Sequence, residues 1–322
     1  MRAVESALVL GGGGFIGRSL VRELRARGVR VVVLTRSGPP ETGVEWLTTD
    51  LASVDVGRIA TERRVDTVFD LAGSADAPGS LRAPLDDLES NAGQTLRTLE
   101  SLRGVPTPPV YVYGSSAAVY GRVSRVPIEE GDLPRPLSPY AVSKLTAEKY
   151  VSLYQRVHGQ PAMSLRLFSV YGPGQRKQAI FDLMRQARTS GDALRVNAPA
   201  DVTRDFIFIK DVVNATIALA EHAPAEGEIY NVASGHEISM DELAKAILVA
   251  SGARKVVTFG DSLRPGDPHR YVGATDRIAA LGVHLDTPLG VGLAQTAEWI
   301  RGPERRRARY TGRWAVRAAE SR

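Results

Sequence analysis

Four consecutive glycines lie where a short apolar segment passes into an amphipathic one. Ser6 to Leu10 form the apolar run, Gly11 to Gly14 follow, and Phe15 to Arg27 then carry apolar side chains at helical spacing. This order predicts a strand, a tight turn and a helix, because glycine lets the backbone bend sharply and approach a ligand closely. A helix N-terminus at such a turn offers N–H groups and positive potential, so we predict a phosphate-binding site here.

Three motifs fit the glycine turn. Gly12, Gly14 and Gly17 fit GxGxxG, and Gly11, Gly14 and Gly17 fit the variant GxxGxxG, both of which indicate a dinucleotide site. The stretch from Gly12 to Arg18-Ser19 comes close to a P-loop, and residues 70–73 supply a DxxG. We favour a dinucleotide site, because an arginine stands where the P-loop needs its phosphate-binding lysine.

Strand-like and helix-like segments alternate beyond the turn. Apolar runs predict strands at Val29–Leu34, Val65–Leu71, Val110–Tyr113, Ser164–Val170 and Phe206–Ile209, and helical patterns cover about Val56–Arg63 and Leu85–Leu102. The alternation predicts an α/β fold with a Rossmann-type doubly wound parallel sheet and a smaller C-terminal α/β substrate domain. We assign residues 1–170 to the dinucleotide-binding domain with the catalytic residues. Residues 171–300 mainly form the substrate domain, partly interleaved with the first, and residues 301–322 are a basic tail.

The length and the amino-acid composition exclude several classes of protein and of functional site for this chain. The chain has 322 residues, enough for about two domains, and its lack of cysteine excludes disulfides, cysteine-ligated metals and a cysteine nucleophile. The net charge of +5 comes from the tail, where eight arginines and two glutamates give +6. We expect this tail to be a solvated terminus rather than a nucleic-acid site. No stretch of 18 apolar residues is present, and we expect a cytoplasmic protein without a membrane partner.

The end of the second predicted strand bears on the choice of cofactor. The strand ends Leu34-Thr35-Arg36, without the carboxylate that accepts from the ribose 2′-hydroxyl of NAD. An arginine can pair with a 2′-phosphate, so we favour NADP(H) over NAD(H). In the alternative interpretation, Arg36 is an exposed loop cation and Thr35 contacts the ribose.

A tyrosine and a lysine four residues apart form the sharpest chemical feature. Ser138 and Pro139 fit the start of a helix, and Tyr140 and Lys144 then share one face of it. The ammonium and the helix dipole should lower the pKa of the phenol, which makes Tyr140 a candidate acid/base near neutral pH. The alternative is a surface pair without a catalytic role.

Together, these motifs resemble the extended short-chain dehydrogenases/reductases, in particular the NAD(P)-dependent nucleotide-sugar epimerase/dehydratase family. The resemblance covers about residues 6–300 and rests on segments that stand in the family's order: Gly11–Gly17, Thr49–Leu51, Val68–Ala72, Ser115–Gly121, Ser138–Lys144, Arg166–Gln175, Arg204–Ile207 and Arg264–Asp267.

The resemblance implies a role for each matching residue. Ser116, Tyr140 and Lys144 would be catalytic, and Ser116 would also hydrogen-bond the sugar oxygen. Substrate contacts would further involve Ser169, Arg204 and Arg264, with the two arginines on the substrate diphosphate unless they form structural ion pairs. The cofactor would be held by Gly11, Gly14, Phe15, Ile16, Gly17, Arg36, Asp50, Leu51, Leu71, Ala72, Asn91, Tyr140 and Lys144.

Departures from the family pattern reduce the number of reactions that we expect this chain to catalyse. Dehydratases of the family carry Asp-Glu after the catalytic hydroxyl residue, where this chain has Ala117-Ala118, so loss of water is not expected. Ser169 replaces the usual asparagine, which leaves one substrate contact open, and Asp70 replaces a common histidine. No histidine spacing fits a metal site.

The remaining chemistry is hydride transfer on a nucleotide-diphosphate sugar. We favour an NAD(P)-dependent 4-epimerase that acts through a 4-keto intermediate. The alternatives are an NADPH-dependent 4-ketosugar reductase and, in another class, a non-catalytic NADP- or RNA-binding relative. The resemblance also implies a homodimer through two helices, about Leu85–Leu102 and Tyr140–His158.

Overall fold

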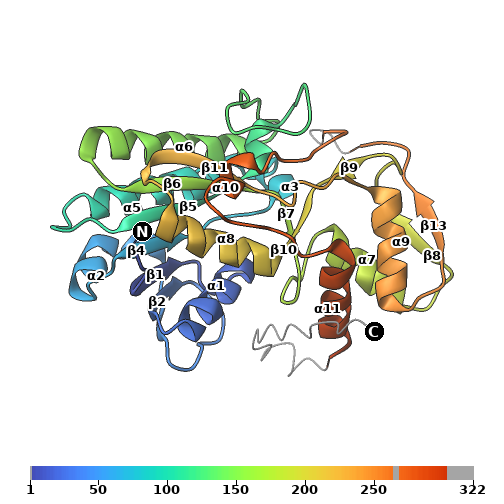
Figure 1. The fold of residues 1–322 in the computed structure, drawn as a ribbon, viewed down its shortest axis with the longest axis horizontal. Helices are drawn as coiled ribbons and strands as arrows, with labels where there is room; N and C mark the ends of the chain where they lie inside the picture. The colour runs from blue at the N-terminus through green and yellow to red at the C-terminus, as the bar shows by residue number, and fades with distance from the viewer. Residues whose placement is uncertain (1, 264–267, 303–322) are drawn as a thin grey trace.

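The computed structural model describes residues 2–263 and 268–302, in which a seven-stranded parallel sheet carries helices on both faces (Figure 1). The strand order is β11-β6-β5-β4-β1-β2-β3. From β1 the chain adds β2 and β3 on one side of the sheet and then β4, β5, β6 and β11 on the other, so the strand order reverses at β1. This order confirms the predicted Rossmann-type doubly wound sheet. The strands are β1 (Ser6–Leu10), β2 (Arg30–Thr35), β3 (Glu45–Thr48), β4 (Thr67–Asp70), β5 (Val110–Ser116), β6 (Ala162–Leu167) and β11 (Glu226–Val232).

Alternate side chains of each strand enter two separate cores. In β1, Ala7 and Val9 pack with α1 (Phe15–Ala26) and α8 (Ile209–His222), whereas Leu8 and Leu10 belong to the core of the other face. That second face is covered by α2 (Val56–Glu62), α5 (Gln94–Leu102) and α6 (Pro139–His158). Burial on both faces explains why the inner strands of the sheet are mostly apolar along their length.

The helical segment predicted over about Leu85–Leu102 is present but is not one regular helix. It consists of α4 (Pro84–Leu88), a π-helical turn (Glu89–Gly93) and α5 in direct succession. Shorter elements nearby are α3 (Ala77–Ser80) and 3₁₀ turns at Leu51–Ser53 and Ala117–Tyr120. The π turn changes which residues face inward, and it buries Asn91 against the rest of the fold.

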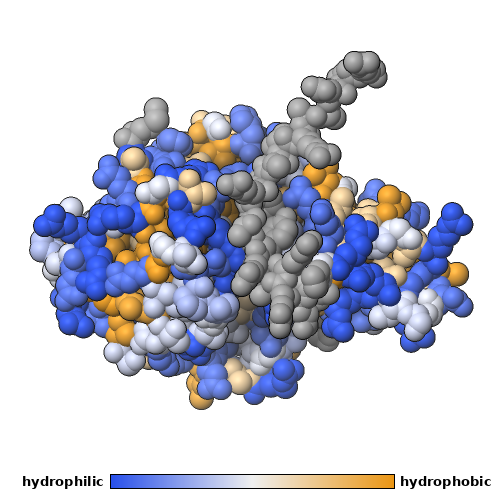
Figure 2. All heavy atoms as spheres, turned by 90° about the horizontal axis from the view of Figure 1, so that it is seen from below, coloured by the Kyte–Doolittle hydropathy of each residue, from blue (hydrophilic) through white to orange (hydrophobic). Residues whose placement is uncertain are grey.

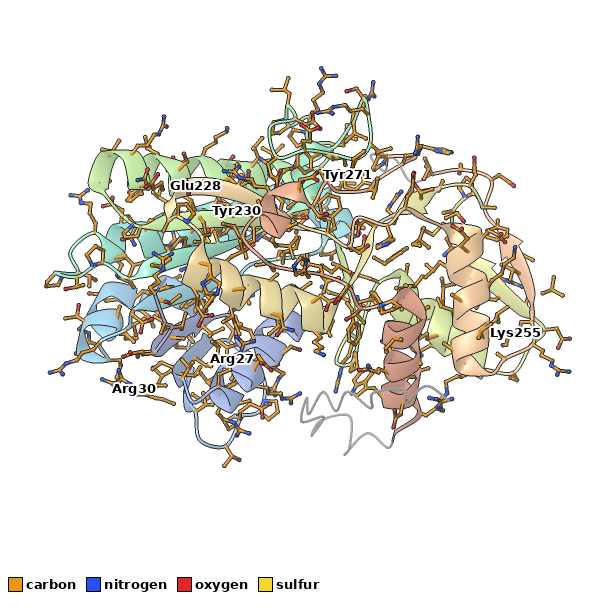
Figure 3. The ribbon with its side chains drawn as sticks, in the orientation of Figure 1. Arg27, Arg30, Glu228, Tyr230, Lys255 and Tyr271 are labelled. Atoms are coloured by element: carbon orange, nitrogen blue, oxygen red, sulfur yellow. The ribbon has the colours of Figure 1, made fainter. Side chains whose placement is uncertain are left out.

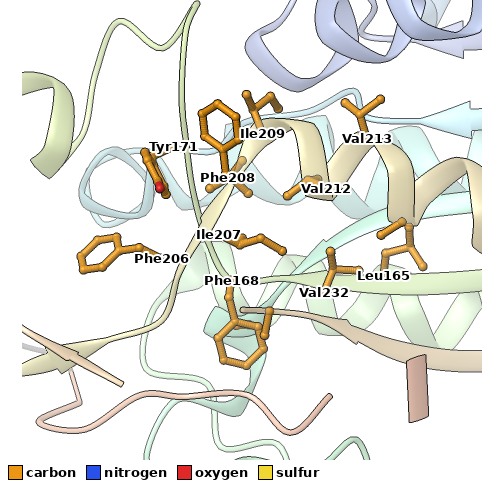
Figure 4. Close-up of a cluster of buried hydrophobic side chains, with 14 of the residues drawn as sticks. Leu165, Phe168, Tyr171, Phe206, Ile207, Phe208, Ile209, Val212, Val213 and Val232 are labelled. Atoms are coloured by element: carbon orange, nitrogen blue, oxygen red, sulfur yellow. The ribbon is translucent and has the colours of Figure 1, made fainter. Parts of the chain in front are cut away.

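The predicted strand Ser164–Val170 is two strands, because the chain changes its partner at Phe168. The Phe168 N–H donates to Val232 of β11 at 3.1 Å, and the next N–H, of Ser169, donates to Asp205 at 3.0 Å. From there β7 (Ser169–Tyr171) pairs with β10 (Phe206–Phe208) instead of with the central sheet. Apolar side chains of β7, β10 and α8 fill the space around this change of partner (Figure 4).

A smaller lobe lies to the right of the sheet in Figure 1. It contains two short strand pairs, β8 (Ala193–Val196) with β13 (Val256–Phe259) and β9 (Thr203–Arg204) with β12 (Ile238–Ser239). Its helices are α7 (Ala179–Arg188), α9 (Met240–Ser251) and α11 (Leu289–Arg301), while α10 (Asp276–Ala279) packs against β11. The chain leaves the central sheet after β6, builds part of this lobe and returns to the sheet as β11.

The sequence pattern missed two strands of the central sheet, β3 and β11, and the four short strands β8, β9, β12 and β13 of the smaller lobe. In the central sheet, β3 and β11 are edge strands, and their sequences Glu45–Thr48 and Glu226–Val232 mix charged residues and, in β11, a glycine with apolar ones. The division into domains at residue 170 stays a prediction.

The surface drawn in Figure 2 is largely hydrophilic, and the helices are too short or too polar to cross a membrane in the part of the chain described. The face seen from below shows hydrophilic side chains with smaller hydrophobic areas among them, as expected for a solvated surface (Figure 2). Among the residues described, no helix has the length and the apolar character needed to cross a membrane.

Candidate active site

The glycine turn is a tightly packed cradle at the carboxyl end of β1. A Cβ on Gly17 would lie 2.4 Å from the Gly11 carbonyl oxygen, and one on Gly11 would lie 2.7 Å from the carbonyl oxygen of Leu71. Gly14 caps α1 without any side-chain hydrogen bond, and the first turn of α1 carries no acidic residue. Phe15 and Ile16 are half-buried in this turn. These features fit a phosphate group at the helix N-terminus.

The other predicted cofactor residues follow neighbouring strands at the same edge of the sheet. Arg36 follows β2 and is exposed, Asp50 and Leu51 follow β3, and Leu71 and Ala72 follow β4. The exposed Asp50 carboxylate accepts from the N–H of Ala52 at 3.1 Å. The carboxyl ends of parallel strands beside the reversal of strand order are where open α/β sheets bind nucleotides.

The loop after β2 does contain a carboxylate, which the sequence pattern did not point to. Glu41 lies between Arg18 and Arg22 of α1, at 2.9 and 2.7 Å. Two guanidinium groups therefore balance its charge. The buried Thr35 hydroxyl donates to the carbonyl of Ser37 at 3.0 Å, so its proton is already used within the loop.

Ser116, Tyr140 and Lys144 come together where β5 ends and α6 begins. Ser138 caps α6 by accepting from Ala141 N–H at 3.2 Å. Tyr140 follows in the first turn, and its hydroxyl is hydrogen-bonded by Ser116. Lys144 is buried, donates to the Gly114 carbonyl at 2.9 Å and lies over the Tyr113 ring at 4.9 Å.

The expectation that the ammonium lowers the pKa of Tyr140 is wrong for this structure. Burial raises the pKa of the phenol, the hydrogen bond from Ser116 opposes that rise, and the carboxylate of Asp87 adds to it. Burial likewise lowers the pKa of Lys144 to about 8, against the charges of Asp70, Asp87 and Glu148. The spacing of Tyr140 and Lys144 shows neither their burial nor the carboxylates that surround them.

A buried ion pair fixes α6 against the sheet. Arg166 of β6 contacts Glu148 of α6 at 2.7 Å, and the two side chains are only 2% and 1% exposed. Ser115 donates to the same carboxylate at 2.5 Å, and the guanidinium lies 4.5 Å from the centre of the Tyr120 ring. Glu148 stands one helical turn after Lys144, so this pair holds the face of α6 that carries the lysine. The sequence analysis missed the pair, although an arginine within an apolar strand is a usable signal.

Asp70 stabilises the turn after β4. It is buried, accepts from the Ala72 N–H at 3.0 Å and accepts from the Tyr111 hydroxyl. Burial raises the pKa of this carboxyl, and the hydrogen bonds from Tyr111 and Ala72 and the charge of Lys144 oppose the rise. The residue that replaces the family's histidine thus orders the segment of Leu71 and Ala72.

The predicted substrate residues lie on the side of the smaller lobe. Ser169 is half-buried at the start of β7. Arg204 on β9 donates to the carbonyls of Thr203 and Pro268 at 2.7 and 2.9 Å. Its charge also acts on Tyr271, whose hydroxyl donates to the Ala117 carbonyl, next to Ser116 (Figure 3 labels Tyr271). Arg264 lies outside the described residues.

Comparisons with known proteins agree with this geometry. A model of the NAD dependent epimerase/dehydratase family matches residues 7–233. The UDP-glucose 4-epimerase of Mycolicibacterium smegmatis is 30% identical, over 91% of this chain and 98% of its own length. The GDP-6-deoxy-D-mannose reductase of Pseudomonas aeruginosa is 33% identical, over 66% and 72%. The solved structure of MoeE5 with UDP-glucuronic acid and NAD is 33% identical over 92% of this chain and 99% of that chain, with a TM-score of 0.84.

The buried ion pair yields a stability prediction. Glu148→Leu leaves the Arg166 guanidinium buried without its carboxylate and should lower the free energy of unfolding by about 3–5 kcal/mol. The double variant Glu148→Leu/Arg166→Met removes both charges and should recover most of that loss. Urea unfolding followed by circular dichroism measures both.

The matched control for this experiment is an exposed pair. Lys245→Met breaks the contact with Asp241 on α9, where the lysine is 69% exposed, and should change the free energy of unfolding by at most about 0.5 kcal/mol. A Glu148→Leu loss no larger than that of Lys245→Met would show that the buried pair does not hold α6.

Proposed function

We propose that this chain, which belongs to the NAD dependent epimerase/dehydratase family of extended short-chain dehydrogenases/reductases, is a nucleotide-sugar 4-epimerase. The observation that carries the proposal is the grouping of Ser116, Tyr140 and Lys144 beside the glycine cradle. Ala117 and Ala118, which follow Ser116, carry no acid or base, so the site is suited to hydride transfer and not to elimination of water.

The cradle fits a dinucleotide cofactor. Gly11 and Gly17 let the backbone of the turn, of α1 and of the segment after β4 pack closely together, and α1 begins without a capping side chain, so its first N–H groups are available to a phosphate. A bound nicotinamide cofactor supplies a hydride acceptor and donor.

Each catalytic residue then has one task in the reaction. Tyr140 would take the proton of the sugar 4-hydroxyl as C4 is oxidised to a ketone. Ser116 hydrogen-bonds the same oxygen and opposes the rise that burial gives to the pKa of Tyr140. Lys144, as the family resemblance implies, would hold the ribose hydroxyls of the cofactor. Once the ketosugar had rotated and C4 had been reduced on its other face, Tyr140 would return the proton to the C4 oxygen. The product is the 4-epimer, with no net oxidation.

Two other functions remain as alternatives. A 4-ketosugar reductase would use the same residues for one reduction by NADPH, and the relatives include a sugar-nucleotide reductase as well as an epimerase. A non-catalytic NADP- or RNA-binding protein would rely on the basic tail, of which residues 303–322 lie outside the described part of the chain.

We also propose that NADP(H) is preferred over NAD(H). The support is the exposed Arg36 after β2, together with the balanced charge of Glu41, which would not repel a 2′-phosphate. The solved structure of MoeE5 contains NAD. Use of NADP(H) would therefore be a difference between this chain and the MoeE5 complex.

A cytoplasmic homodimer completes the proposal. Five apolar side chains on α4 and α6 are exposed: Leu85, Leu88, Val142, Leu153 and Val157, at 78%, 43%, 46%, 40% and 62%. These elements pack side by side and match the two helices expected at a dimer interface. A second copy of this face would cover these side chains.

Tyr140→Phe tests whether the protein is an enzyme of this kind. Without its acid/base, turnover of a nucleotide sugar should fall at least about 100-fold, with cofactor affinity within about twofold of the original. Tyr150→Phe, on the same helix, is the control and should keep full activity. Equal activity in the Tyr140 and Tyr150 variants would favour the non-catalytic alternative.

The same assay separates epimerase from reductase. Protein is mixed with a nucleotide 4-ketosugar and NADPH, and the absorbance at ~340 nm is followed. An epimerase should leave this absorbance unchanged and interconvert 4-epimers of the nucleotide sugar. Stoichiometric loss of the absorbance would establish the reductase instead.

Arg36→Ala tests the cofactor preference. Loss of a charge-assisted contact to the 2′-phosphate should weaken NADP⁺ binding roughly tenfold and leave NAD⁺ binding unchanged, as measured by isothermal titration calorimetry. Arg30→Ala is the control, since Arg30 lies at the opposite end of β2, at the lower left of the molecule in Figure 3. Equal effects on both cofactors would contradict the preference.

Leu153→Asp tests the dimer interface. A charge on this face should raise the dimer dissociation constant by at least about tenfold, because the carboxylate would be desolvated on association. Val249→Asp on α9, where the valine is 83% exposed, is the control. Light scattering after size exclusion gives the masses. An unchanged dimer in the Leu153 variant would place the interface elsewhere.

A further inference from the structure

Asp205 is a buried carboxylate between β9 of the smaller lobe and β10. Its side chain accepts four hydrogen bonds. Oδ1 accepts from the N–H and the hydroxyl of Ser234, both at 2.7 Å, and Oδ2 accepts from the N–H groups of Gly235 and Gly273, at 3.0 and 3.2 Å. All four donors are uncharged, and they compensate for removing the carboxylate from water.

The four donors belong to two segments that are distant from Asp205 in the sequence. The loop after β11 supplies three of them, and the fourth, the N–H of Gly273, belongs to the segment 268–274. This segment packs closely, because a Cβ on Gly273 would lie 2.7 Å from the ring of Phe168. A single carboxylate therefore joins the chain between β9 and β10 to the edge of the central sheet and to a third part of the fold.

Two of the predicted substrate residues are attached to Asp205 through the backbone. Arg204 precedes it in the chain, and the N–H of Ser169 donates to the Asp205 carbonyl at 3.0 Å. The Arg204 guanidinium in turn donates to the carbonyl of Pro268 at 2.9 Å, at the start of the segment 268–274. Fixing the Asp205 side chain therefore also fixes the backbone on which both predicted substrate residues depend.

The segment 268–274 also reaches the proposed catalytic residues. The hydroxyl of Tyr271 donates to the carbonyl of Ala117, which directly follows Ser116. Two residues further along the segment, the N–H of Gly273 donates to the buried carboxylate. This carboxylate thus lies where the predicted substrate residues, the sheet edge and the turn after β5 are connected by hydrogen bonds.

We propose that Asp205 is a positioning residue, whose hydrogen bonds hold the substrate-binding side of the site at a fixed distance from Ser116. This inference rests on the proposed function, because Arg204 and Ser169 are the residues expected to contact its substrate. Asp205 would touch neither the sugar nor the cofactor. Its hydrogen bonds would order the backbone of the substrate-binding residues in advance, so that less conformational freedom is lost when the nucleotide sugar binds.

Asp205→Asn tests the proposal through the separate effects on KM and kcat. An amide nitrogen in place of either carboxylate oxygen would face N–H or O–H groups that need an acceptor. KM for the nucleotide sugar should rise at least about tenfold, while kcat falls less than about threefold because β5 and α6 keep their own contacts. The affinity for NADP⁺, measured by calorimetry, should stay within about twofold of the original. An unchanged KM would overturn the proposal.

Asp211 on α8 provides a matched control. Its carboxylate is also buried, at 7% exposed, and it accepts from the N–H and the hydroxyl of Thr287 at 3.1 and 2.8 Å. These hydrogen bonds hold the segment before α11 and involve none of the predicted substrate residues. Asp211→Asn should lower the melting temperature, as Asp205→Asn does, and leave KM within about twofold of the original. Equal rises of KM in the two variants would indicate a general loss of stability and contradict the proposal.

A milder variant covers the case in which Asp205→Asn does not fold. Ser234→Ala removes the hydroxyl donor and leaves the three N–H groups on the carboxylate. KM should then rise by roughly two- to fivefold, with kcat unchanged. An unfolded Asp205→Asn together with an unchanged KM in Ser234→Ala would show that the carboxylate acts on folding alone.

A second readout does not depend on turnover. Calorimetric titration with UDP, GDP and dTDP measures the affinity for a nucleoside diphosphate. The one of these that binds the original protein most tightly should bind Asp205→Asn at least about tenfold more weakly and Asp211→Asn equally well. If no nucleotide sugar is turned over but this loss is present, the proposed function fails while the role of Asp205 stands. If turnover is present without the loss, the role of Asp205 fails alone, and binding of none of the three would contradict both.

Discussion

The fold depends on a close approach of backbone to backbone at the end of β1. Gly17 of α1 lies against the Gly11 carbonyl, and Gly11 in turn lies against the carbonyl of Leu71 after β4. These contacts bring the start of α1 and the ends of two adjacent strands to one point. No side chain fits between them, so the elements that would hold a dinucleotide are fixed by main-chain packing rather than by rotamers.

A second constraint acts on α6, the helix that carries the proposed catalytic residues. Glu148 and Arg166 connect the middle of α6 with β6, while Ser138 and Ser80 hold its first turn through hydrogen bonds to backbone N–H groups. Tyr140 and Lys144 lie between these attachments. Their side chains are therefore oriented before any ligand arrives, which is the preorganisation that acid/base chemistry requires.

Much of the fold follows from the sequence alone, and so does the grouping of the candidate site residues at one edge of the sheet. The glycine run, the apolar strands and the capped Tyr140 helix are local patterns, and these elements formed close to their predicted ranges, apart from Ser164–Val170, which is two strands. The edge strands β3 and β11 were missed because exposure at the sheet edge permits charged residues that hide the pattern. The altered pKa of Tyr140 and the inward carboxylate of Asp87 depend on distant segments and on a π turn, and no local spacing encodes them.

The return of the chain to the sheet as β11 has a consequence for synthesis in the cell. Until residues 226–232 leave the ribosome, β6 is an open edge, and its unpaired N–H and C=O groups are available to any other extended chain. The nascent protein must therefore pass through a stage in which most of the nucleotide-binding half is made but not yet closed.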